Sequence, residues 1–428
     1  MSAEKLPHGC HHPAGPACAA GRPDHHPAPA SPPAPAVNPI PLAAALLVLV
    51  GLAVWVFDAH GAKPGVLLLL GAGLGFTLFH SRFGFTGAWR QLVGVGNGAG
   101  LRAHALLLGT SATLFALIIG TGTGLFGAKP APSAGSLGVA LVLGSFLFGV
   151  GMQLGGACAS GTLFAVGSGQ SSILVTLVGF IVGSTLYTWQ YSLVDNLPSF
   201  QPFLLSDHVG WFGSWAITIA ALAVVVWVSL AVQRRRNPPP VGSVPTARGV
   251  LRVVRGSWPL WAGALVLSFL GAGVLLVSGG AWGVTSAFGL WGAKILRALG
   301  GHPENWSYWR QPASAASLTG PVLTDKNSLT DIGIMVGAAV AAAAGGVWTL
   351  HRHIPARTAL AGLLGGVLLG IGARLAGGCN IGAYLAGIAS GSLSGWVWGL
   401  AALAGTWVGL RLRPLFGLTN PKPTDSVC

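Results

Sequence analysis

Two stretches far apart in the chain repeat one pattern: residues 149–161 read GVGMQLGGACASG, and residues 370–382 read GIGARLAGGCNIG. Each places one cysteine, Cys158 or Cys379, in a glycine-rich break between apolar segments. Lipid offers no hydrogen bonds to the backbone, so a broken helix at membrane depth persists only where protein or a water-filled cavity satisfies it. The repeated stretches therefore predict a duplicated path through a membrane, with a cysteine in each half.

The composition agrees with a membrane protein. Of the 428 residues, 52% are hydrophobic and only 7% are charged, which leaves no room for an ordinary soluble domain. We therefore expect an all-α polytopic membrane protein. The formal net charge of +14 lies mainly in short loops beside apolar spans, so it reflects membrane topology and does not indicate a nucleic-acid partner.

Ten segments are long and apolar enough to cross a lipid bilayer. They are residues 41–57, 63–80, 103–121, 136–153, 172–191, 212–232, 258–278, 330–350, 357–374 and 394–411. The connection after the sixth span is rich in arginine: Arg234, Arg235, Arg236, Arg248, Arg252 and Arg255. The positive-inside rule makes this loop cytoplasmic, and both termini then also fall in the cytoplasm of a multi-pass protein in the bacterial inner (plasma) membrane.

The chain divides into five parts. Residues 1–37 form a Pro-, His- and Cys-containing cytoplasmic tail that we expect to be disordered. Residues 38–232 contain an extra first span, the first repeat and a connecting span. A basic cytoplasmic linker (233–257), the second repeat (258–412) and a cytoplasmic tail (413–428) follow. The first tail includes Cys10, His11, His12 and Cys18, and such tracts can bind metal. Their spacing matches no standard zinc pattern, so we expect no metal site and no cofactor.

A second repeat accompanies the first. Residues 83–89 (FGFTGAW) align with residues 282–288 (WGVTSAF), each just after the first span of its half. Each half then reads as a span, a broken segment, two spans, a second broken segment and a last span. Equivalent spans lie five crossings apart, and an odd displacement turns the second half upside down. The sequence therefore predicts two inverted repeats of transmembrane helices with re-entrant broken helices.

The inverted arrangement brings both cysteines near the membrane midplane. Short helices that begin after Cys158 and Cys379 would present their N-terminal N–H groups to the centre, where an anion is favoured. A thiol is soft and polarizable, which suits a sulfur or selenium atom better than a hard oxyanion. The alternative is that each cysteine is a small packing residue. The candidate substrate-binding residues are Cys158, Cys379, Arg374, Gly84, Thr86, Gly283, Thr285, Gly156, Gly378 and Asn380.

Three polar residues have two interpretations each. Arg374, whose counterpart in the first half is Gln153, either neutralises an entering anion or extends to the membrane interface. Thr86 and Thr285 either contact the ion or cap short helices.

We interpret Asp331 as a helix-start residue rather than a proton carrier. No acidic residue then lies within a span. We therefore expect a facilitated, channel-like path with trapping of the substrate downstream.

The cysteine loops resemble the YeeE/YedE family of sulfur-transport proteins. The matching parts are residues 155–162 (GGACASGT), 377–382 (GGCNIG) and 82–86 (RFGFT), within a resemblance that covers about residues 60–412. It implies an hourglass-like importer of thiosulfate or a related sulfur anion, whose thiols contact the ion, with a small cytosolic TusA-like sulfur carrier as a possible partner. Some members have another cysteine where this chain has Gly84, which leaves two intramembrane cysteines here.

Other classes remain open at this stage. The chain could be a membrane sulfurtransferase that holds a persulfide, a path for selenium species, a passive anion channel or a membrane scaffold. No histidine lies near either cysteine in sequence, and the spans contain no acid–base pairs. The sequence therefore favours a transporter over an enzyme.

Overall fold

The computed structural model describes residues 37, 39–238, 249–350 and 354–422. The chain separates into two units, Met1–Pro32 and Pro33–Cys428, and all described residues belong to the second. The Cys- and His-containing N-terminal tail, for which we expect no metal site, lies outside the described residues, as do Arg248 and Cys428.

The described residues contain ten helical segments long and apolar enough to cross a membrane, and each contains or overlaps one of the ten expected spans. The chain is therefore an all-α, multi-pass membrane protein. The long helices are α1 (Pro39–His60), α2 (Ala62–Ser81), α4 (Ala99–Thr121), α5 (Val139–Leu154), α7 (Ser171–Trp189), α9 (Ser206–Arg236), α11 (Leu260–Ser278), α15 (Lys326–Ala344), α16 (Ala356–Leu375) and α18 (Leu393–Leu412).

Shorter elements connect these spans. They are α3 (Phe85–Val95), α6 (Ala159–Gly167), α8 (Tyr191–Val194), α10 (Leu251–Arg255), α12 (Thr285–Ala298), α13 (Ser307–Arg310), α14 (Pro312–Thr319), α17 (Ala386–Ala389), a π-helix η3 (Asn380–Leu385), and the 3₁₀ turns η1 (Pro303–Asn305), η2 (Val322–Thr324) and η4 (Arg413–Phe416). Two short strands, β1 (Leu137–Gly138) and β2 (Ser199–Phe200), pair antiparallel.

Glycines let the central helices approach backbone to backbone. A Cβ built on Gly75 of α2 would lie 2.0 Å from the carbonyl oxygen of Ile334 in α15, and one built on Gly149 of α5 would lie 2.2 Å from that of Ala402 in α18. Such small residues are how membrane helices gain close packing when lipid provides no hydrophobic drive between them. An alanine at either glycine would force the two helices apart.

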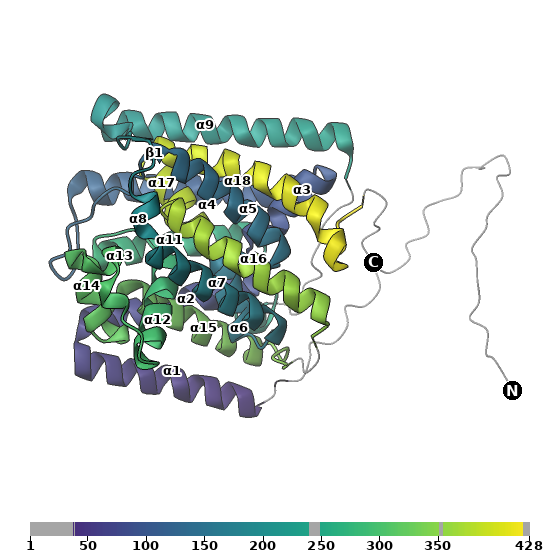
Figure 1. Ribbon diagram of the computed structural model, residues 1–428. Coiled ribbons are helices and arrows are strands. Elements are labelled where there is room, and N and C mark those ends of the chain that lie inside the picture. Colours follow the sequence, from purple (N-terminus) through teal and green to yellow (C-terminus); the bar gives the residue numbers. More distant parts are fainter. Residues whose placement is uncertain (1–36, 38, 239–248, 351–353, 423–428) are drawn as a thin grey trace, which may run out of the picture. The chain divides into compact units, whose positions relative to one another are not determined.

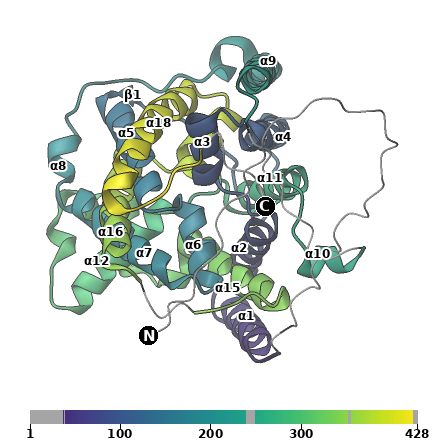
Figure 2. The ribbon, with the colours of Figure 1, turned by 90° about the vertical axis from the view of Figure 1, so that its right-hand side faces the viewer.

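The central helices pack in corresponding pairs from the two halves of the chain. Helix α7 packs on α16, and α5 packs on α18; likewise α2 packs on α15, and α11 packs on α4. Figure 1 shows α5, α7 and α16 together, and Figure 2 shows α2 beside α15 and α1. The short helices follow the same rule, since α6 contacts α15 while α17 contacts α4, and α12 contacts α7 while α3 contacts α18. Each of these contacts in one half thus has a counterpart in the other.

Two helices lie outside this paired core. Helix α1 packs on α2 and α15, and α9 packs on α4. Only Val56 of α1 is buried, and most of α9 is exposed apart from four small or apolar residues. Because these helices expose large apolar side chains such as Leu47 and Trp227, they present apolar surface of the kind that lipid covers.

Candidate functional site

Four short helices begin at the four expected breaks. Their N-cap residues are Gly84 before α3, Cys158 before α6, Val284 before α12 and Cys379 before η3, and each has backbone angles outside the helical region. The expectation that short helices begin directly after Cys158 and Cys379 is thus confirmed. Both cysteines lie beside the N–H groups and the positive dipole end of a broken helix.

The backbone before each cysteine is fixed by the last helix of its half. The Thr176 hydroxyl of α7 donates to the carbonyl oxygen of Gly155 at 3.0 Å, and the indole N–H of Trp398 in α18 donates to that of Gly378 at 3.1 Å. Each donor is the sixth residue of its helix. Gly156 and Gly378 have φ angles of 82° and 155°, a region that side chains with a Cβ avoid, so glycine is required at these two turns.

Both cysteines are buried, with 2% of Cys158 and 1% of Cys379 exposed. The Cys158 sulfur lies 3.7 Å from the Ser160 hydroxyl. Among the described residues, no histidine or carboxylate hydrogen-bonds to either thiol. The thiols therefore lack the paired base that a nucleophilic cysteine uses.

A cavity of about 520 Å³ opens beside Cys158, and we call it the Cys158 cavity. Its lining includes Arg82, Gly84, Thr86, Arg90, His104, Gly156, Cys158 and Gly161. A Cβ built on Gly84 would meet no atom within 4 Å, while one on Gly161 would lie 3.2 Å from the Cys158 sulfur. The space beside Gly84 is thus open, and Gly161 leaves room for the thiol.

Gln153 holds a cation in this cavity. The guanidinium of Arg90 donates to the Gln153 side-chain oxygen at 3.0 Å, and Arg413 donates to the Gln153 backbone carbonyl at 2.6 Å. Gln153 also approaches the carbonyl oxygen of Thr86 at 3.4 Å. The counterpart of Arg374 is therefore not a charge itself but positions one.

Neither threonine acts as a helix cap. The cap of α3 is Gly84 and that of α12 is Val284, so the capping interpretation of Thr86 and Thr285 is wrong. The Thr86 hydroxyl is buried and has no hydrogen-bond partner among the described residues. It remains available to a ligand.

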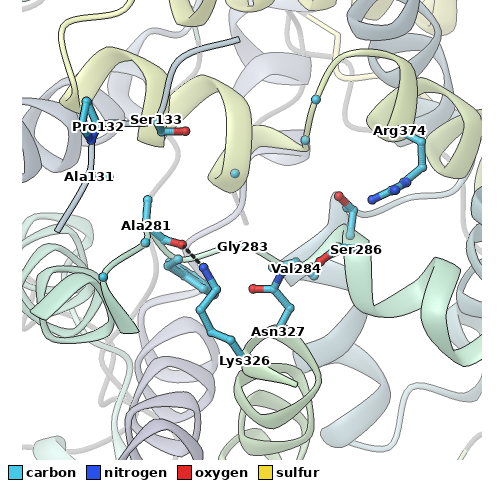
Figure 3. A pocket seen from close by; sticks show the side chains of 17 residues that line it. Ala131, Pro132, Ser133, Ala281, Gly283, Val284, Ser286, Lys326, Asn327 and Arg374 are labelled. Carbon is cyan, nitrogen blue, oxygen red and sulfur yellow. Dashed lines mark hydrogen bonds between the residues drawn. The ribbon is translucent and has the colours of Figure 1, made fainter. Parts of the chain in front are cut away.

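A second cavity of about 350 Å³, which we call the Arg374 cavity, is lined mainly by residues of the second half. Its lining includes Gly283, Thr285, Ser286, Lys326, Asn327, Arg374, Gly377, Gly378 and Gly382. Lys326 donates to the carbonyl oxygen of Ala281 at 3.0 Å, and the Asn327 amide donates to the Ser286 hydroxyl (Figure 3). The Asn327 side-chain oxygen has no partner among the described residues.

Arg374 lines this cavity. Its guanidinium lies 5.5 Å from the centre of the Tyr187 ring and 4.9 Å from that of Tyr308, and it donates to the Tyr308 hydroxyl. Figure 3 shows the side chain reaching toward Ser286. Its buried Nε atom has no partner among the described residues, so the group keeps a donor for an anion.

Glycine backbone forms the floor of the Arg374 cavity. A Cβ on Gly382 would lie 3.8 Å from Gly283, and one on Gly283 would lie 3.1 Å from the Asn327 side-chain oxygen. Cys379 is buried and does not line the cavity, although its neighbours Gly378 and Gly382 do. The next residue, Asn380, is fully buried, and neither its amide nitrogen nor its amide oxygen has a partner among the described residues.

The sequence interpretation missed two polar residues that line this cavity, Lys326 and Asn327. Both precede the expected eighth span, but α15 already begins at Lys326. Asp325 caps it by accepting from the Ser328 N–H at 2.8 Å. Asp331 therefore lies inside the helix and is fully buried, so both the helix-start interpretation and the statement that no acidic residue lies within a span are wrong.

No group of three or more His, Cys, Asp or Glu side chains suited to a metal occurs in the described part of the chain. The site consists instead of two buried thiols at helix N-termini, with a cationic cavity beyond each. Ten apolar spans and broken helices around such a centre define a membrane transport protein of the broken-helix class.

Comparison with known proteins identifies the family. A family model described as Sulphur transport matches residues 80–408. "Thiosulfate transporter TsuA" of Spirochaeta thermophila is 27% identical over 348 residues, 79% of this chain and 96% of that protein. "Thiosulfate transporter TsuA" of Escherichia coli (strain K12) is 26% identical over 359 residues, 79% of this chain and 92% of that protein. "Probable transporter YedE" of the same strain is 31% identical over 167 residues, 37% of this chain and 41% of that protein.

Because the family match spans most of the chain, the protein belongs to the Sulphur transport family, as the resemblance to YeeE/YedE predicted. These relatives are named as transporters, which confirms the interpretation of the chain as a transporter rather than an enzyme.

Proposed function

We propose that the protein imports thiosulfate or a related sulfur-containing anion, and that the ion passes from the Arg374 cavity to the Cys158 cavity in contact with both thiols. The observation that carries this proposal is the placement of each buried cysteine at the N-cap of a broken helix, between two cationic cavities. The printed names of two relatives supply the substrate class.

Charge and polar groups support passage of an anion. An anion that leaves water loses solvation, which only positive groups, dipoles and hydrogen-bond donors replace. Lys326 and Arg374 face one cavity, and Arg82 and Arg90 face the other. Buried donors without partners among the described residues include the Asn380 amide and the Thr86 hydroxyl, and Thr86 lines the Cys158 cavity. Such groups are rarely left unsatisfied, so a polar ligand fits here.

Thiols suit a sulfur anion that must also leave. A hydroxyl or ammonium group binds a hard oxygen strongly, whereas a thiol is a weak donor with a polarizable sulfur. Conduction needs binding that is favourable enough for entry and weak enough for release. Two successive thiols therefore provide contacts for the terminal sulfur of thiosulfate without trapping the ion.

The paired packing of the two halves supports the proposal of inverted repeats around an hourglass-like path. With cytoplasmic termini and a bacterial inner membrane, the Cys158 cavity then opens to the cytoplasm and the Arg374 cavity to the outside. A small TusA-like carrier would collect the substrate at the cytoplasmic mouth, where Arg82 and Arg90 lie. Membrane lipid would cover the exposed apolar helices.

The test is uptake of radiolabelled thiosulfate by vesicles that contain the purified protein. The proposal expects saturable accumulation, inhibited by excess unlabelled thiosulfate, in wild-type vesicles and none in vesicles without protein. A sulfurtransferase would instead convert thiosulfate without accumulating it, and a scaffold would do neither. Conversion without accumulation, or accumulation that thiosulfate does not inhibit, contradicts the proposal.

A further inference from the structure

Asp331 is a buried carboxyl group that the proposed path leaves unused. None of its surface is exposed, and neither oxygen has a hydrogen-bond partner among the described residues. No ion pair to Asp331 occurs in the described part of the chain either. An ionised carboxylate in such surroundings is costly, and an ionisable residue inside a membrane span is a functional-site candidate by default.

The Asp331 side chain lies on the same face of α15 as Asn327, which lines the Arg374 cavity one turn earlier. Asn327, four residues earlier, lines that cavity, and Ser328, three residues earlier, accepts a hydrogen bond from Trp291 of α12 at 2.9 Å. Residues three and four apart share one face of a helix. Asp331 is therefore about 6 Å deeper than Asn327 along the helix axis.

The neighbouring face of α15 is occupied by α2. A Cβ on Gly71 of α2 would lie 2.5 Å from the Thr330 carbonyl oxygen, and Gly75 meets Ile334 in the same way. Asp331 lies about 100° from Thr330 around the helix, at the edge of the face that contacts α2. Asn327, one turn earlier, lies beside Gly283, and Gly283 lies beside Gly382 of the Cys379 loop.

The elements packed against α15 carry few groups that could pair with Asp331. Helices α6 and η2 have no titratable side chain. Helix α15 itself carries Lys326, and its cap is Asp325. The titratable groups on the other packed elements are Lys63 and His80 on α2, Lys294 and Arg297 on α12, Asp58 and His60 on α1, and Arg252 and Arg255 on α10. Among the described residues, no hydrogen bond or ion pair joins Asp331 to any of these groups.

We propose that Asp331 is a proton-binding site, and that it must hold a proton while the transported anion contacts the Cys379 thiol. The proposal rests on the proposed function and adds to it a proton requirement. The carboxylate takes a proton from water in the Arg374 cavity and becomes a neutral carboxyl, with no bond to the anion. An ionised Asp331 would repel a dianion at Cys379, whereas the protonated group is neutral and can donate its O–H.

Proton binding and anion binding are then linked in both directions. A proton on Asp331 raises the affinity for the anion, and the bound anion raises the affinity of Asp331 for the proton by the same factor. The fraction of the expected facilitated path that the anion occupies therefore depends on pH. The Asp331→Asn variant keeps the shape of the protonated side chain and removes the titration.

The first experiment measures the half-saturating thiosulfate concentration in vesicles at about pH 5.5 and about pH 8.5, on either side of an ordinary buried-carboxyl titration. The wild type should show at least a tenfold higher value at the higher pH, and Asp331→Asn should show the same value at both. Asp325→Asn is the matched control, because asparagine also caps helices and this carboxyl is six residues away. It should keep the wild-type profile.

The second experiment has a readout on the wild-type protein, which does not depend on whether a variant folds. Thiosulfate is added to the purified wild-type protein in weakly buffered detergent solution at about pH 8.5, and a pH indicator follows proton uptake. Substrate should cause protein-dependent proton uptake, which Asp331→Asn should lack.

Three results would overturn the proton site: a wild-type affinity that does not change with pH, a wild-type pH profile retained by Asp331→Asn, or no proton uptake on binding. The second result would assign the dependence to another group, such as His104 of the Cys158 cavity. These results differ from the failure of the proposed function, in which the wild type shows no saturable uptake at any pH.

Discussion

The Cys158 cavity and the Arg374 cavity have the same plan but differ in how their cysteine is reached. Cys158 lines its cavity, and Gly84 leaves open space in front of it. Cys379 does not line the Arg374 cavity, where Gly283 and Gly382 lie close together. Equivalent backbone breaks thus give one thiol that lines a cavity and one that does not. The two cavities differ in which side chains occupy the space between the breaks and in where glycine leaves that space open.

Loss of either thiol should have the largest effect. Cys158→Ala and Cys379→Ala should each lower thiosulfate uptake by vesicles about a hundredfold or more. Each variant removes a soft sulfur contact to the ion, and we expect that loss to cost about 2 to 3 kcal/mol. Cys428→Ala, in the C-terminal tail, is the matched control and should transport as the wild type does. Wild-type uptake by both core variants would show that the cysteines only pack.

The two cationic cavities should respond differently to loss of charge. Arg374→Ala should lower uptake at least tenfold and raise the half-saturating concentration, since removal of a half-buried charge partner costs about 2 to 5 kcal/mol. Arg90→Ala, on the opposite side, should lower the maximal rate more than the affinity. Arg297→Ala, near the exposed end of α12, is the control. An unchanged concentration dependence in Arg374→Gln would remove this arginine from the path.

The glycine floor predicts a smaller, asymmetric effect. Gly283→Ala should lower uptake about threefold to tenfold, because its Cβ would lie 3.1 Å from Asn327 and narrow the route to Cys379. Gly84→Ala should change uptake less than about twofold, since its Cβ meets open space and its φ of −138° suits any residue. Initial uptake rates of the two variants provide the comparison. Equal losses in both would contradict the difference between the cavities.

A fourth prediction concerns stability. Thr176→Val and Trp398→Phe each remove the hydrogen bond that fixes the turn before a cysteine, at 3.0 and 3.1 Å. A buried carbonyl left without its donor costs about 1 to 3 kcal/mol. Both variants should therefore have lower thermal unfolding midpoints in detergent, by similar amounts. A loss in only one of them would mean that the two turns are not held equivalently.

Much of the fold could be predicted because lipid imposes a simple rule. Spans must satisfy their own backbone and expose apolar side chains, so long apolar runs mark them directly. The eighth span shows the limit of this reasoning: we expected residues 330–350, and α15 runs from Lys326 to Ala344. Hydropathy assigns Lys326 and Asn327 to a loop, but the Asp325 cap starts the helix and Gly345 ends it.

The site was predictable where a local pattern determines it. A cysteine in a glycine-rich break must precede a helix, and both do. The partners of Gln153 could not be predicted, since it meets Arg90 across 63 residues and Arg413 across 260. Asp331 was misread because its own neighbours in sequence resemble a helix start, and only the packing of α2, α6 and α12 around α15 buries it.

The sequence by itself determined the spans, the duplicated breaks and the pair of soft thiols, because each depends on composition and spacing within a short stretch. Tertiary structure decided which thiol lines a cavity, which cations face each cavity and that the Asp331 carboxyl is buried. The physical reason is that burial and pairing depend on side chains contributed by distant segments. Their positions are set only when glycine-lined helices from the two halves pack together.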